Sequence, residues 1–584
     1  MSSNIRGHVS AAALLIAASG AAFAQPIRPY DGSYNNVVNP DWGSTDARLV
    51  RATPSDYADG ISAPAGADRP GPREISNSCA DQGRDPIWSS RVLTSMTTFW
   101  GQFIDHDIGI TEPPESAFEP MMIIVPDDDP FFNSEVTPVL PFLRSRYDHA
   151  TGTGVENPRE QINQITAYID ASNVYGHTAA RAAALRSGTD GKLRMGPDDL
   201  LPANTMGIAM ANPFGIPDEA LFAGGDVRAN ENPALTCLHT VFAREHNRKC
   251  DELLAADPFL TDEQLYQRAR TWVGSLIQHI TYDQFLPALL GADDLPLYTG
   301  YDNTVNAGIA NEFAHGAYRV GHTMVNPLLA RYDANGQVFA DGHLDLLSSF
   351  FNPAPVFEPG GVDAIVRGIV RQASQEVDMQ VIDDLRNLLF PAGSGGMDLV
   401  SVNIQRGRDH GLASYNAHRV AYGLPPANDW SDVTSKILVQ DALAGLYGTP
   451  DNADLWIAGL AEDHASNASL GPTFTAIIAD QFRRIRDGDR FWYERMHSTA
   501  ELDEIYATTL ADVITRNTSV TGLQANLFFL SVDFNADGFM NVDDIDAFIT
   551  FFLAADARAD LNGDGAHNVD DLEIFVDAFL TLFG

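Results

Sequence analysis

Lysine is almost absent from this chain of 584 residues, which contains only Lys192, Lys249 and Lys436. The 37 Lys and Arg residues face 78 Asp and Glu residues, so the formal net charge is −41. Binding to nucleic acid or to an anionic membrane surface depends on a field of positive charge, which this composition does not supply. We therefore expect neither kind of partner.

Cysteine is equally scarce, with only Cys79, Cys237 and Cys250. An odd number this small rules out a disulfide framework. Cys237 and Cys250 fall in one predicted helix, where a rise of about 1.5 Å per residue holds them too far apart to bridge. We expect all three to be free thiols with no metal or redox role.

Long apolar runs are also missing. The apolar stretch at residues 11–18 is shorter than the roughly 20 residues that span a bilayer, and no later segment reaches that length without charges. Arg6 precedes this stretch, and the small-residue pattern Ala22-Phe23-Ala24 follows it. Together these features predict a cleaved signal peptide over residues 1–24 and a secreted protein without a membrane span.

The remaining chain divides into three parts by composition. Residues 25–72 are rich in Gly, Pro, Ser and Asp and predict an irregular N-terminal arm. Residues 73–519 carry helix-like apolar spacing, for example at 234–255, 263–290 and 362–389, and little strand-like alternation. We therefore expect a mainly α domain there, followed by a separate small α module at residues 528–584.

The C-terminal module contains a repeat, with copies that begin 27 residues apart. Each copy places oxygen groups at the ligand positions of an EF-hand loop and a glycine at the sharp turn. The predicted calcium ligands are Asp533, Asn535, Asp537, Phe539 (carbonyl), Asn541 and Asp544, then Asp560, Asn562, Asp564, Ala566 (carbonyl), Asn568 and Asp571. A solvated acidic tail is the alternative. The repeat resembles a dockerin module, which implies a cohesin-like or cell-surface partner, although it could instead cap the C-terminus.

Five further segments combine His, Arg, Asp and Asn in recurring clusters, at residues 100–107, 166–176, 224–248, 318–327 and 403–416. In content and order they resemble the animal-type haem peroxidases, the myeloperoxidase- and peroxidasin-like branch of the peroxidase-cyclooxygenase superfamily. The likeness covers residues 73–494. It implies a helical peroxidase domain with haem b, which cleaves hydrogen peroxide at the haem and oxidises a small reducing donor.

The first cluster reads Trp-Gly-Gln-Phe-Ile-Asp-His-Asp over residues 100–107. The resemblance implies that His106 is the distal base and that Gln102, one turn away, holds water or a halide. It also implies that Asp105 forms an ester with a haem methyl group and that Asp107 binds calcium. Alone, this stretch could equally be a surface Asp-His-Asp cluster.

The second cluster resembles the calcium loop of the same family. Thr166, Asp170 and Ser172 would supply side-chain oxygens and Tyr168 its carbonyl, with Asp107 completing the site. Alternate residues of an extended backbone point to one side, and hard oxygen ligands suit Ca²⁺. An ordinary turn is the alternative reading of this segment.

The third cluster resembles the family's Gly-Asp-x-Arg-x-x-Glu segment. The resemblance makes Arg228 the distal cation that stabilises charge on the leaving oxygen, and Glu231 the second ester-forming carboxylate. Asn232 follows Glu231 where myeloperoxidase has the methionine that makes a sulfonium link to haem. We therefore expect that third link to be absent.

The proximal side is expected from the last two clusters. The resemblance implies that His322 ligates the haem iron and that Arg319 pairs with a haem propionate. Asn403 would accept the second ring N–H of His322, which fixes the tautomer. His246, His315, His410 and His418 lack matching ligand positions, and we interpret them as structural.

The resulting hypothesis is a secreted, calcium-containing haem peroxidase that oxidises halides, pseudohalides or phenols. A fatty-acid dioxygenase of the same superfamily is one alternative, but Arg319 stands where cyclooxygenases carry the radical-forming tyrosine. A non-catalytic, calcium-dependent adhesion protein is another, because a fold alone does not guarantee chemistry.

Overall fold

A computed structural model describes residues 27–83, 85–114, 116, 118–291, 295–358, 360–389, 396–530, 532, 534, 541–556, 559, 561 and 566–583. The helical elements, with η for 3-10 and π segments, are α1 (Pro72–Cys79), α2 (Ser95–Ile108), α3 (Ser172–Tyr175), α4 (Ala179–Leu185), η1 (Pro197–Asp199), η2 (Asp218–Ala220), α5 (Pro233–Ala256), α6 (Asp262–Ile280), η3 (Thr281–Phe285), α7 (Leu286–Leu290), α8 (Asn311–Ala314), η4 (Ala317–His322), α9 (Leu346–Ser349), α10 (Ala354–Phe357), α11 (Gly361–Ile369), η5 (Asp384–Leu388), α12 (Leu399–Asp409), α13 (Tyr415–Ala421), η6 (Trp430–Asp432), α14 (Ile437–Tyr447), η7 (Pro450–Asn452), α15 (Leu455–Ala461), α16 (Pro472–Asp487), α17 (Tyr493–Met496), α18 (Thr499–Tyr506), α19 (Leu510–Asn517), α20 (Val542–Leu553) and α21 (Val569–Phe583). The mainly α prediction is confirmed.

Strands are short and few among the described residues. They are β1 (Ala47–Arg48), β2 (Ile123–Ile124), β3 (Val139–Leu140), β4 (Ile162–Asn163), β5 (Leu328–Leu329) and β6 (Leu344–Asp345). They form three antiparallel pairs, β1 with β4, β2 with β3 and β5 with β6. The first pair ties residues 47–48, in the irregular N-terminal segment, to the chain just before residues 166–172.

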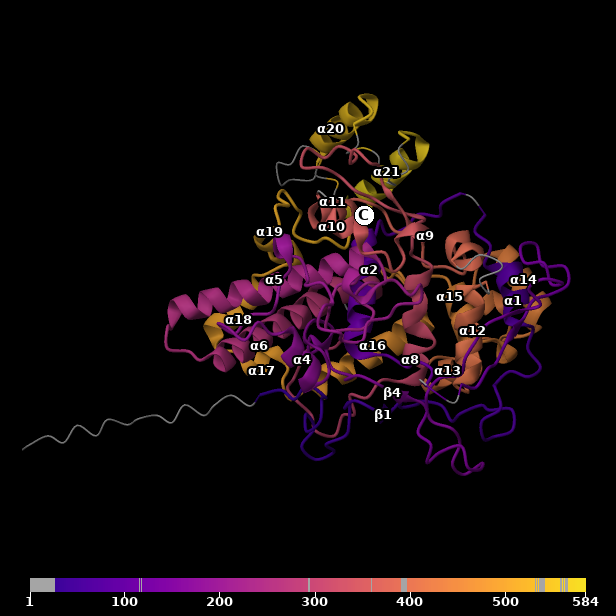
Figure 1. Ribbon diagram of the computed structural model, residues 1–584. Helices are drawn as coiled ribbons and strands as arrows, with labels where there is room; N and C mark the ends of the chain where they lie inside the picture. The colour runs from indigo at the N-terminus through magenta and orange to yellow at the C-terminus, as the bar shows by residue number, and fades with distance from the viewer. Residues whose placement is uncertain are drawn as a thin grey trace, which may run out of the picture.

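The core is built around the long helices α5 and α6, with α2 packed against α5 (Figure 1). Helix α5 begins where the Asn232 side chain accepts a hydrogen bond from the Leu235 N–H, and Pro233 occupies the first turn. On α2, Trp100 and Phe103 are fully buried, and Phe103 stacks on Phe242 of α5 at 5.4 Å between ring centroids. This packing fixes α2, the helix that carries residues 100–107.

The three sequence-predicted helices have different outcomes. The helix expected at residues 234–255 is confirmed as α5, and that at 263–290 is present as α6, η3 and α7 in succession. The helix expected at residues 362–389 is wrong between Ile369 and Asp384, and η5 is helical again at Asp384–Leu388. After Ile369 the backbone leaves the helix and pairs with the chain leading into α2, as in the Ser374 N–H to Leu93 carbonyl bond of 2.8 Å. Tertiary backbone pairing overrides the local apolar pattern.

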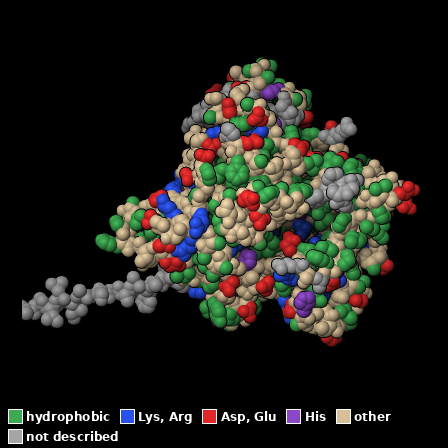
Figure 2. All heavy atoms as spheres, viewed as in Figure 1, with side chains coloured by type: hydrophobic (Ala, Val, Ile, Leu, Met, Phe, Trp, Pro, Cys, Tyr) green, Lys and Arg blue, Asp and Glu red, His purple; other side chains and the backbone are tan. Residues whose placement is uncertain are grey.

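The three cysteines are free and buried, as expected. No helix among the described residues has both the length and the apolarity to cross a membrane. On the face drawn in Figure 2, acidic and hydrophobic side chains are interspersed and no broad basic field is visible.

Helices α20 and α21 form a small unit beside the main body, at the top of Figure 1. Phe548 of α20 stacks on Phe575 of α21 at 4.1 Å between centroids, and both belong to a buried cluster that includes Val92 and Ala373 of the main body. The Ala373 N–H also donates to the Leu561 carbonyl at 3.1 Å. The C-terminal helices therefore share a core with the peroxidase-like region.

Candidate active site

Helix α2 points three successive polar side chains in three directions, because each residue turns by about 100° around the axis. Asp107 is fully buried and His106 only 3% exposed. The Asp105 side chain, between buried Ile104 and His106, keeps 41% of its surface accessible. An accessible carboxylate in the middle of a buried helix indicates an internal hollow beside it.

Arg228 lies in the loop before α5 and is held by Asp226. Its Nε donates to Asp226 Oδ1 at 2.8 Å and its Nη2 to Asp226 Oδ2 at 3.0 Å, while Nη2 also donates to the Gly109 carbonyl at 3.0 Å. Nη1 lies 3.6 Å from Asp105 Oδ2. Burial would lower the pKa of Arg228, but Asp226 more than offsets this, so the guanidinium keeps its charge.

His106 faces two carboxylates. Its Nε2 lies 3.5 Å from Glu231 Oε2 and its Nδ1 lies 3.8 Å from Asp226 Oδ1. Nδ1 is buried and has no hydrogen-bond partner among the described residues. Burial, and then the nearby charge of Arg228, lower the pKa of His106 well below its ordinary value. At neutral pH the imidazole is therefore neutral and able to accept a proton.

The carboxyl groups of Asp105 and Glu231 both have raised pKa values. Burial raises the pKa of Asp105, and it raises the pKa of Glu231 to about 7 even though Arg228 opposes the shift. The Glu231 side chain nevertheless keeps 28% of its surface accessible. Both carboxyls thus border the hollow, and conversion to a neutral ester would remove the cost of holding their charges there.

Gln102 and Asn232 are joined across the same wall. The Asn232 Nδ2 donates to Gln102 Oε1 at 2.9 Å, while the Asn232 Oδ1 caps α5. The amide N–H₂ of Gln102 is then the group left to donate to a small ligand. Asn232 is committed to these two bonds and has no sulfur, so the expected absence of a sulfonium link follows from its chemistry.

The opposite wall carries His322 at the end of η4. His322 Nδ1 lies 2.9 Å from the Asn403 Nδ2, and the Arg319 Nη1 donates to Asn403 Oδ1 at 2.8 Å. The contact matches the expectation, but its direction differs, since the amide nitrogen faces the ring. The reason is Arg319, which offers only donors and takes the amide oxygen. Burial, followed by the charge of Arg319, lowers the pKa of His322 to about 3.

The two walls are in direct contact at one point. The Tyr318 hydroxyl on η4 donates to the Gly101 carbonyl of α2 at 3.4 Å. A methyl group built on Gly321, the residue before His322, would meet no atom of a non-neighbouring residue within 4 Å, so there is open space beside Gly321. Arg319 also lies close enough to Asp105 to lower its pKa. Accessible carboxylates, open space at Gly321 and a neutral, partly buried His322 fit the requirements of a haem.

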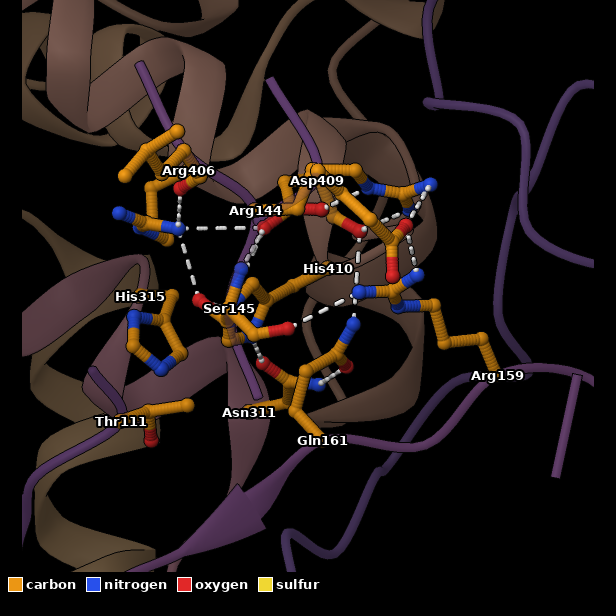
Figure 3. Close-up of polar contacts among 12 residues, drawn as sticks. Thr111, Arg144, Ser145, Arg159, Gln161, Asn311, His315, Arg406, Asp409 and His410 are labelled. Carbon is orange, nitrogen blue, oxygen red and sulfur yellow. Dashed lines mark hydrogen bonds and ion pairs between the residues drawn. The ribbon is translucent and has the colours of Figure 1, made fainter. Parts of the chain in front are cut away.

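Arg319 is backed by a buried polar network, drawn in Figure 3. Asp409 accepts hydrogen bonds from Arg144 Nε at 2.6 Å and Arg406 Nη1 at 3.1 Å, and His410 Nε2 lies 2.7 Å from the Ser145 hydroxyl. The His315 ring lies tilted against His410, with centroids 3.9 Å apart, and the Arg319 Nη2 lies 3.2 Å from His315 Nδ1. These contacts join the C-terminal end of α12 to residues 144–145 and agree with a structural role for both histidines.

The five predicted calcium ligands lie together. Ser172 Oγ donates to Asp107 Oδ1 at 2.9 Å, and Thr166 Oγ1 donates to Asp170 Oδ2 at 3.1 Å and lies 3.4 Å from the Tyr168 carbonyl oxygen. All five residues are at most 5% exposed. Burial, and for Asp107 also the charge of Asp170, raise the pKa of both carboxyls. This is a buried oxygen cluster with two carboxylates.

The backbone of this loop differs from the extended form that we expected. It bends at residues 167, 168 and 170, and Ala171 adopts a left-handed φ of 61°. The turn at Ala171 lets its N–H donate to Asp107 Oδ2 at 3.0 Å. Bending, rather than strand alternation, brings the oxygens together. No group of three or more His, Cys, Asp or Glu side chains suited to a metal occurs in the described part of the chain, and this loop has only two.

The C-terminal loops can be followed only in part. Asn541, Asp544, Ala566, Asn568 and Asp571 are described, whereas Asp533, Asn535, Asp537, Phe539, Asp560, Asn562 and Asp564 lie outside the described residues. Asp544 and Asp571 are fully buried and accept hydrogen bonds from the Asn541 and Asn568 N–H groups at 2.8 and 3.0 Å. The two copies therefore share one pattern of helix capping.

Two residues of the distal wall were not anticipated. Asp226 positions Arg228, and the signal that could have found it is the acid two residues before that arginine. His239 of α5 is 1% exposed and packs against Phe103 at 5.1 Å between ring centroids. Burial lowers its pKa to about 4. A lone histidine inside an apolar helix gives no local signal of this position.

The fold and the paired histidine walls together define a haem-dependent oxidoreductase. The family model for animal haem peroxidases matches residues 27–528, so the chain belongs to the animal haem peroxidase family. Among curated relatives, peroxinectin A of Dictyostelium discoideum is 37% identical over 520 residues, covering 86% of this chain and 96% of that protein. The human peroxidasin homologue is 36% identical over 568 residues, but this chain spans only 38% of its length.

Solved structures agree with this assignment. Peroxidase A from Dictyostelium discoideum, at 36% identity, superposes with a TM-score of 0.81 and covers 87% of this chain and all of that one. The fatty acid alpha-dioxygenase of Oryza sativa covers 86% of this chain and 87% of its own, with a TM-score of 0.71 at 21% identity. That second likeness shows a shared fold.

Proposed function

We propose that this haem peroxidase uses hydrogen peroxide to oxidise halides, pseudohalides or phenolic donors. The observation that carries the proposal is the convergence of His106, Arg228 and Glu231 on one side of the hollow, opposite His322. Histidine and arginine at these places are what proton transfer and charge stabilisation during peroxide cleavage require.

The haem would be held by residues of both walls. His322 would ligate the iron, Asp105 and Glu231 would form esters with haem methyl groups, and Arg319 would pair with a propionate. A neutral His322 suits metal ligation because its nitrogen lone pair is free. With Asn403 beside Nδ1, ligation through Nε2 calls for Nδ1 to carry the proton, so we infer that the Asn403 amide turns over when iron binds. Bound haem would supply the redox chemistry.

Proton movement falls to the chain itself. The imidazole of His106 is neutral at neutral pH. It takes the proton from one oxygen of hydrogen peroxide and delivers it to the other oxygen, which leaves when the O–O bond breaks. Arg228, kept cationic by Asp226, stabilises the negative charge that develops on the leaving oxygen. Gln102 would donate its amide N–H to water or a halide. The donor then supplies two electrons, singly or as a pair.

We also propose that the oxygen cluster around Asp107 binds calcium. Its support is the contact set of Asp107, Thr166, Asp170 and Ser172 with the Tyr168 carbonyl, which are oxygen groups of the kind that Ca²⁺ prefers. The pKa values of Asp107 and Asp170 stay raised even though Arg28 and Arg270 oppose the shift at Asp170, and a divalent cation would stabilise both carboxylates. Because Asp107 follows His106, calcium would also fix the distal helix.

The remaining expectations stay proposals. Export through residues 1–24, calcium binding by the C-terminal repeat and a cohesin-like or cell-surface partner rest on sequence patterns. The dioxygenase alternative draws on the shared fold, but Arg319 occupies the place of its tyrosine and Arg228 with Glu231 favours peroxidase chemistry. A non-catalytic adhesion role is disfavoured by the complete set of His106, Arg228 and His322.

A donor panel tests the proposal. Purified protein with peroxide should oxidise bromide, iodide, thiocyanate or a small phenol, whereas oxygen uptake with a polyunsaturated fatty acid should not occur without peroxide. Oxygen uptake of that kind would favour the dioxygenase. Haem binding with no turnover of any donor would favour the adhesion protein.

A further inference from the structure

A line of aromatic rings runs from the haem wall to a hollow on another side of the domain. Tyr318, adjoining Gly101 on α2, contacts Phe482 of α16 with 5.7 Å between ring centroids. Phe482 contacts Tyr282 of η3 at 5.9 Å, and Tyr282 contacts Trp492 at 4.8 Å. Rings at these separations are in van der Waals contact.

The far end of this line borders a hollow of about 180 Å³. Apolar side chains, among them Leu286, Leu290 and Leu295, line it together with Tyr298 and Trp492. It is smaller than the roughly 300–1,000 Å³ of sites for drug-sized ligands, so it suits a single aromatic ring that enters from solvent. Leu297 on its rim is 89% exposed, so the hollow faces solvent. Such a lining suits an aromatic molecule.

Trp492 has the partner that a redox-active indole needs. Its Nε1–H donates to the Glu494 Oε1 at 3.2 Å, and Glu494 also lines the hollow. Loss of an electron makes the indole N–H strongly acidic, so a carboxylate at this distance can take the proton. Tyr282 has no such base, since its hydroxyl donates to the Phe482 carbonyl. An oxidising equivalent transferred along these aromatic rings would therefore be localised on Trp492.

The surroundings of Trp492 support this role. Trp492 is 2% exposed, and its ring contacts the ring of Tyr298 with 5.8 Å between centroids. The buried hydroxyl of Tyr298 has no hydrogen-bond partner among the described residues. Arg486, the cation at the hollow, is paired with Asp487 at 2.8 Å. Its charge is thereby compensated, and Glu494 remains the group facing the indole nitrogen.

We propose that this hollow is a second donor site, at which phenolic or aromatic-amine molecules too large for the haem hollow are oxidised through Trp492. The proposal rests on the proposed peroxidase function, which supplies the oxidant. Tyr282 is set in a π-helix, a form that often marks functional positions.

The step balances in electrons and protons. One of the two oxidising equivalents that peroxide delivers to the haem site takes an electron from Trp492, whose Nε1 proton moves to Glu494. A phenol in the hollow returns an electron to the indole, Glu494 returns the proton to Nε1, and the phenolic proton passes to water. Each phenol loses one electron and one proton, and two phenols consume one peroxide.

The test compares two donors in the haem-loaded protein, bromide and a phenol coupled to dextran, which is too large to enter the domain. We expect Trp492→Phe to lower kcat/KM for the dextran-phenol by about tenfold or more, with bromide oxidation within about twofold of wild type. Glu494→Gln keeps a hydrogen-bond acceptor but cannot take the proton, and should act in the same direction. Trp272→Phe is the matched control, because Trp272 is buried and donates to Glu245 at 3.0 Å but lies off this line.

A second readout does not depend on donor turnover. With peroxide and a nitroso spin trap but no donor, peptide mass spectrometry should locate adducts on Trp492 or Tyr298 in wild type, and none at these positions in Trp492→Phe. Unchanged dextran-phenol oxidation in both Trp492→Phe and Glu494→Gln, with bromide oxidation intact, would overturn the second site. If wild type oxidises neither donor, the proposed peroxidase function itself fails.

Discussion

Replacing Asp226 by Asn tests how the distal arginine is held. Asp226 accepts two bonds from the Arg228 side chain, at 2.8 and 3.0 Å, and the side chains are only 4% and 13% exposed. Burial alone would raise the pKa of Asp226, but Arg228 more than offsets it and holds the pKa well below its ordinary value. The pair is therefore charged at neutral pH.

Two magnitudes follow from this geometry. Breaking one partner of a buried ion pair costs about 3–5 kcal/mol of the free energy of unfolding. A misplaced charge donor lowers the rate of peroxide cleavage by about 10²-fold, the low end for losing such a group. Because the folded-state pKa of Asp226 is depressed, its stabilisation is complete above the unfolded pKa of about 4 and is lost as pH falls through the folded value.

The assay pairs thermal unfolding with stopped-flow mixing of haem-loaded protein and peroxide at pH 7. Asp148→Asn is the control, because the exposed Arg48–Asp148 pair, at 2.6 Å, should contribute less than about 1 kcal/mol. If Asp226→Asn cleaves peroxide as fast as wild type and unfolds at the same temperature, the Asp226 carboxylate does not position Arg228.

Three further predictions concern the haem and calcium groups. The rate of peroxide cleavage should show no protonation step near pH 6.5, because the pKa of His106 is lowered well below that value; a stopped-flow pH series with a step near 6.5 would contradict this. Haem should resist acid-acetone extraction from wild type but leave the Asp105→Asn, Glu231→Gln double variant, and ready extraction from wild type would exclude the esters. In calcium-free protein, the carboxyl pKa values of Asp107 and Asp170 are higher in the folded state than in the unfolded state, so folding favours their protonated forms. The free energy of unfolding should therefore fall as pH rises above about 4, the unfolded pKa. Thermal unfolding with and without chelator at pH 5 and 8 checks this, and equal melting temperatures would count against a calcium site.

The sequence allowed the mainly helical fold and the family to be predicted because both depend on local patterns. Helix α5 follows from apolar spacing and the Asn232-Pro233 start, and it matches its expected bounds within one residue. The region after Ile369 was mispredicted because its backbone pairs with residues near Leu93, which are far away in the sequence. The local hydrophobic periodicity contains no information about a backbone partner that is distant in the sequence.

The sequence predicted which residues form the site better than it predicted how those residues are arranged. The five predicted calcium ligands do lie together, yet through bends and a left-handed Ala171 rather than an extended backbone. The direction of the Asn403 contact depends on Arg319 competing for its oxygen, which only three-dimensional proximity reveals. The line of aromatic rings from Tyr318 to Trp492 joins residues from four separate segments, so no local sequence motif predicts it.

The most direct test of the central claim is the optical spectrum of the haem-loaded protein during titration with hydrogen peroxide. The Soret band should shift with one equivalent of peroxide and return when bromide or a phenol is added, and His106→Gln should retain the resting haem spectrum while losing the shift. Haem bound by wild type with no spectral change on peroxide addition would contradict the assignment of this protein as an active peroxidase.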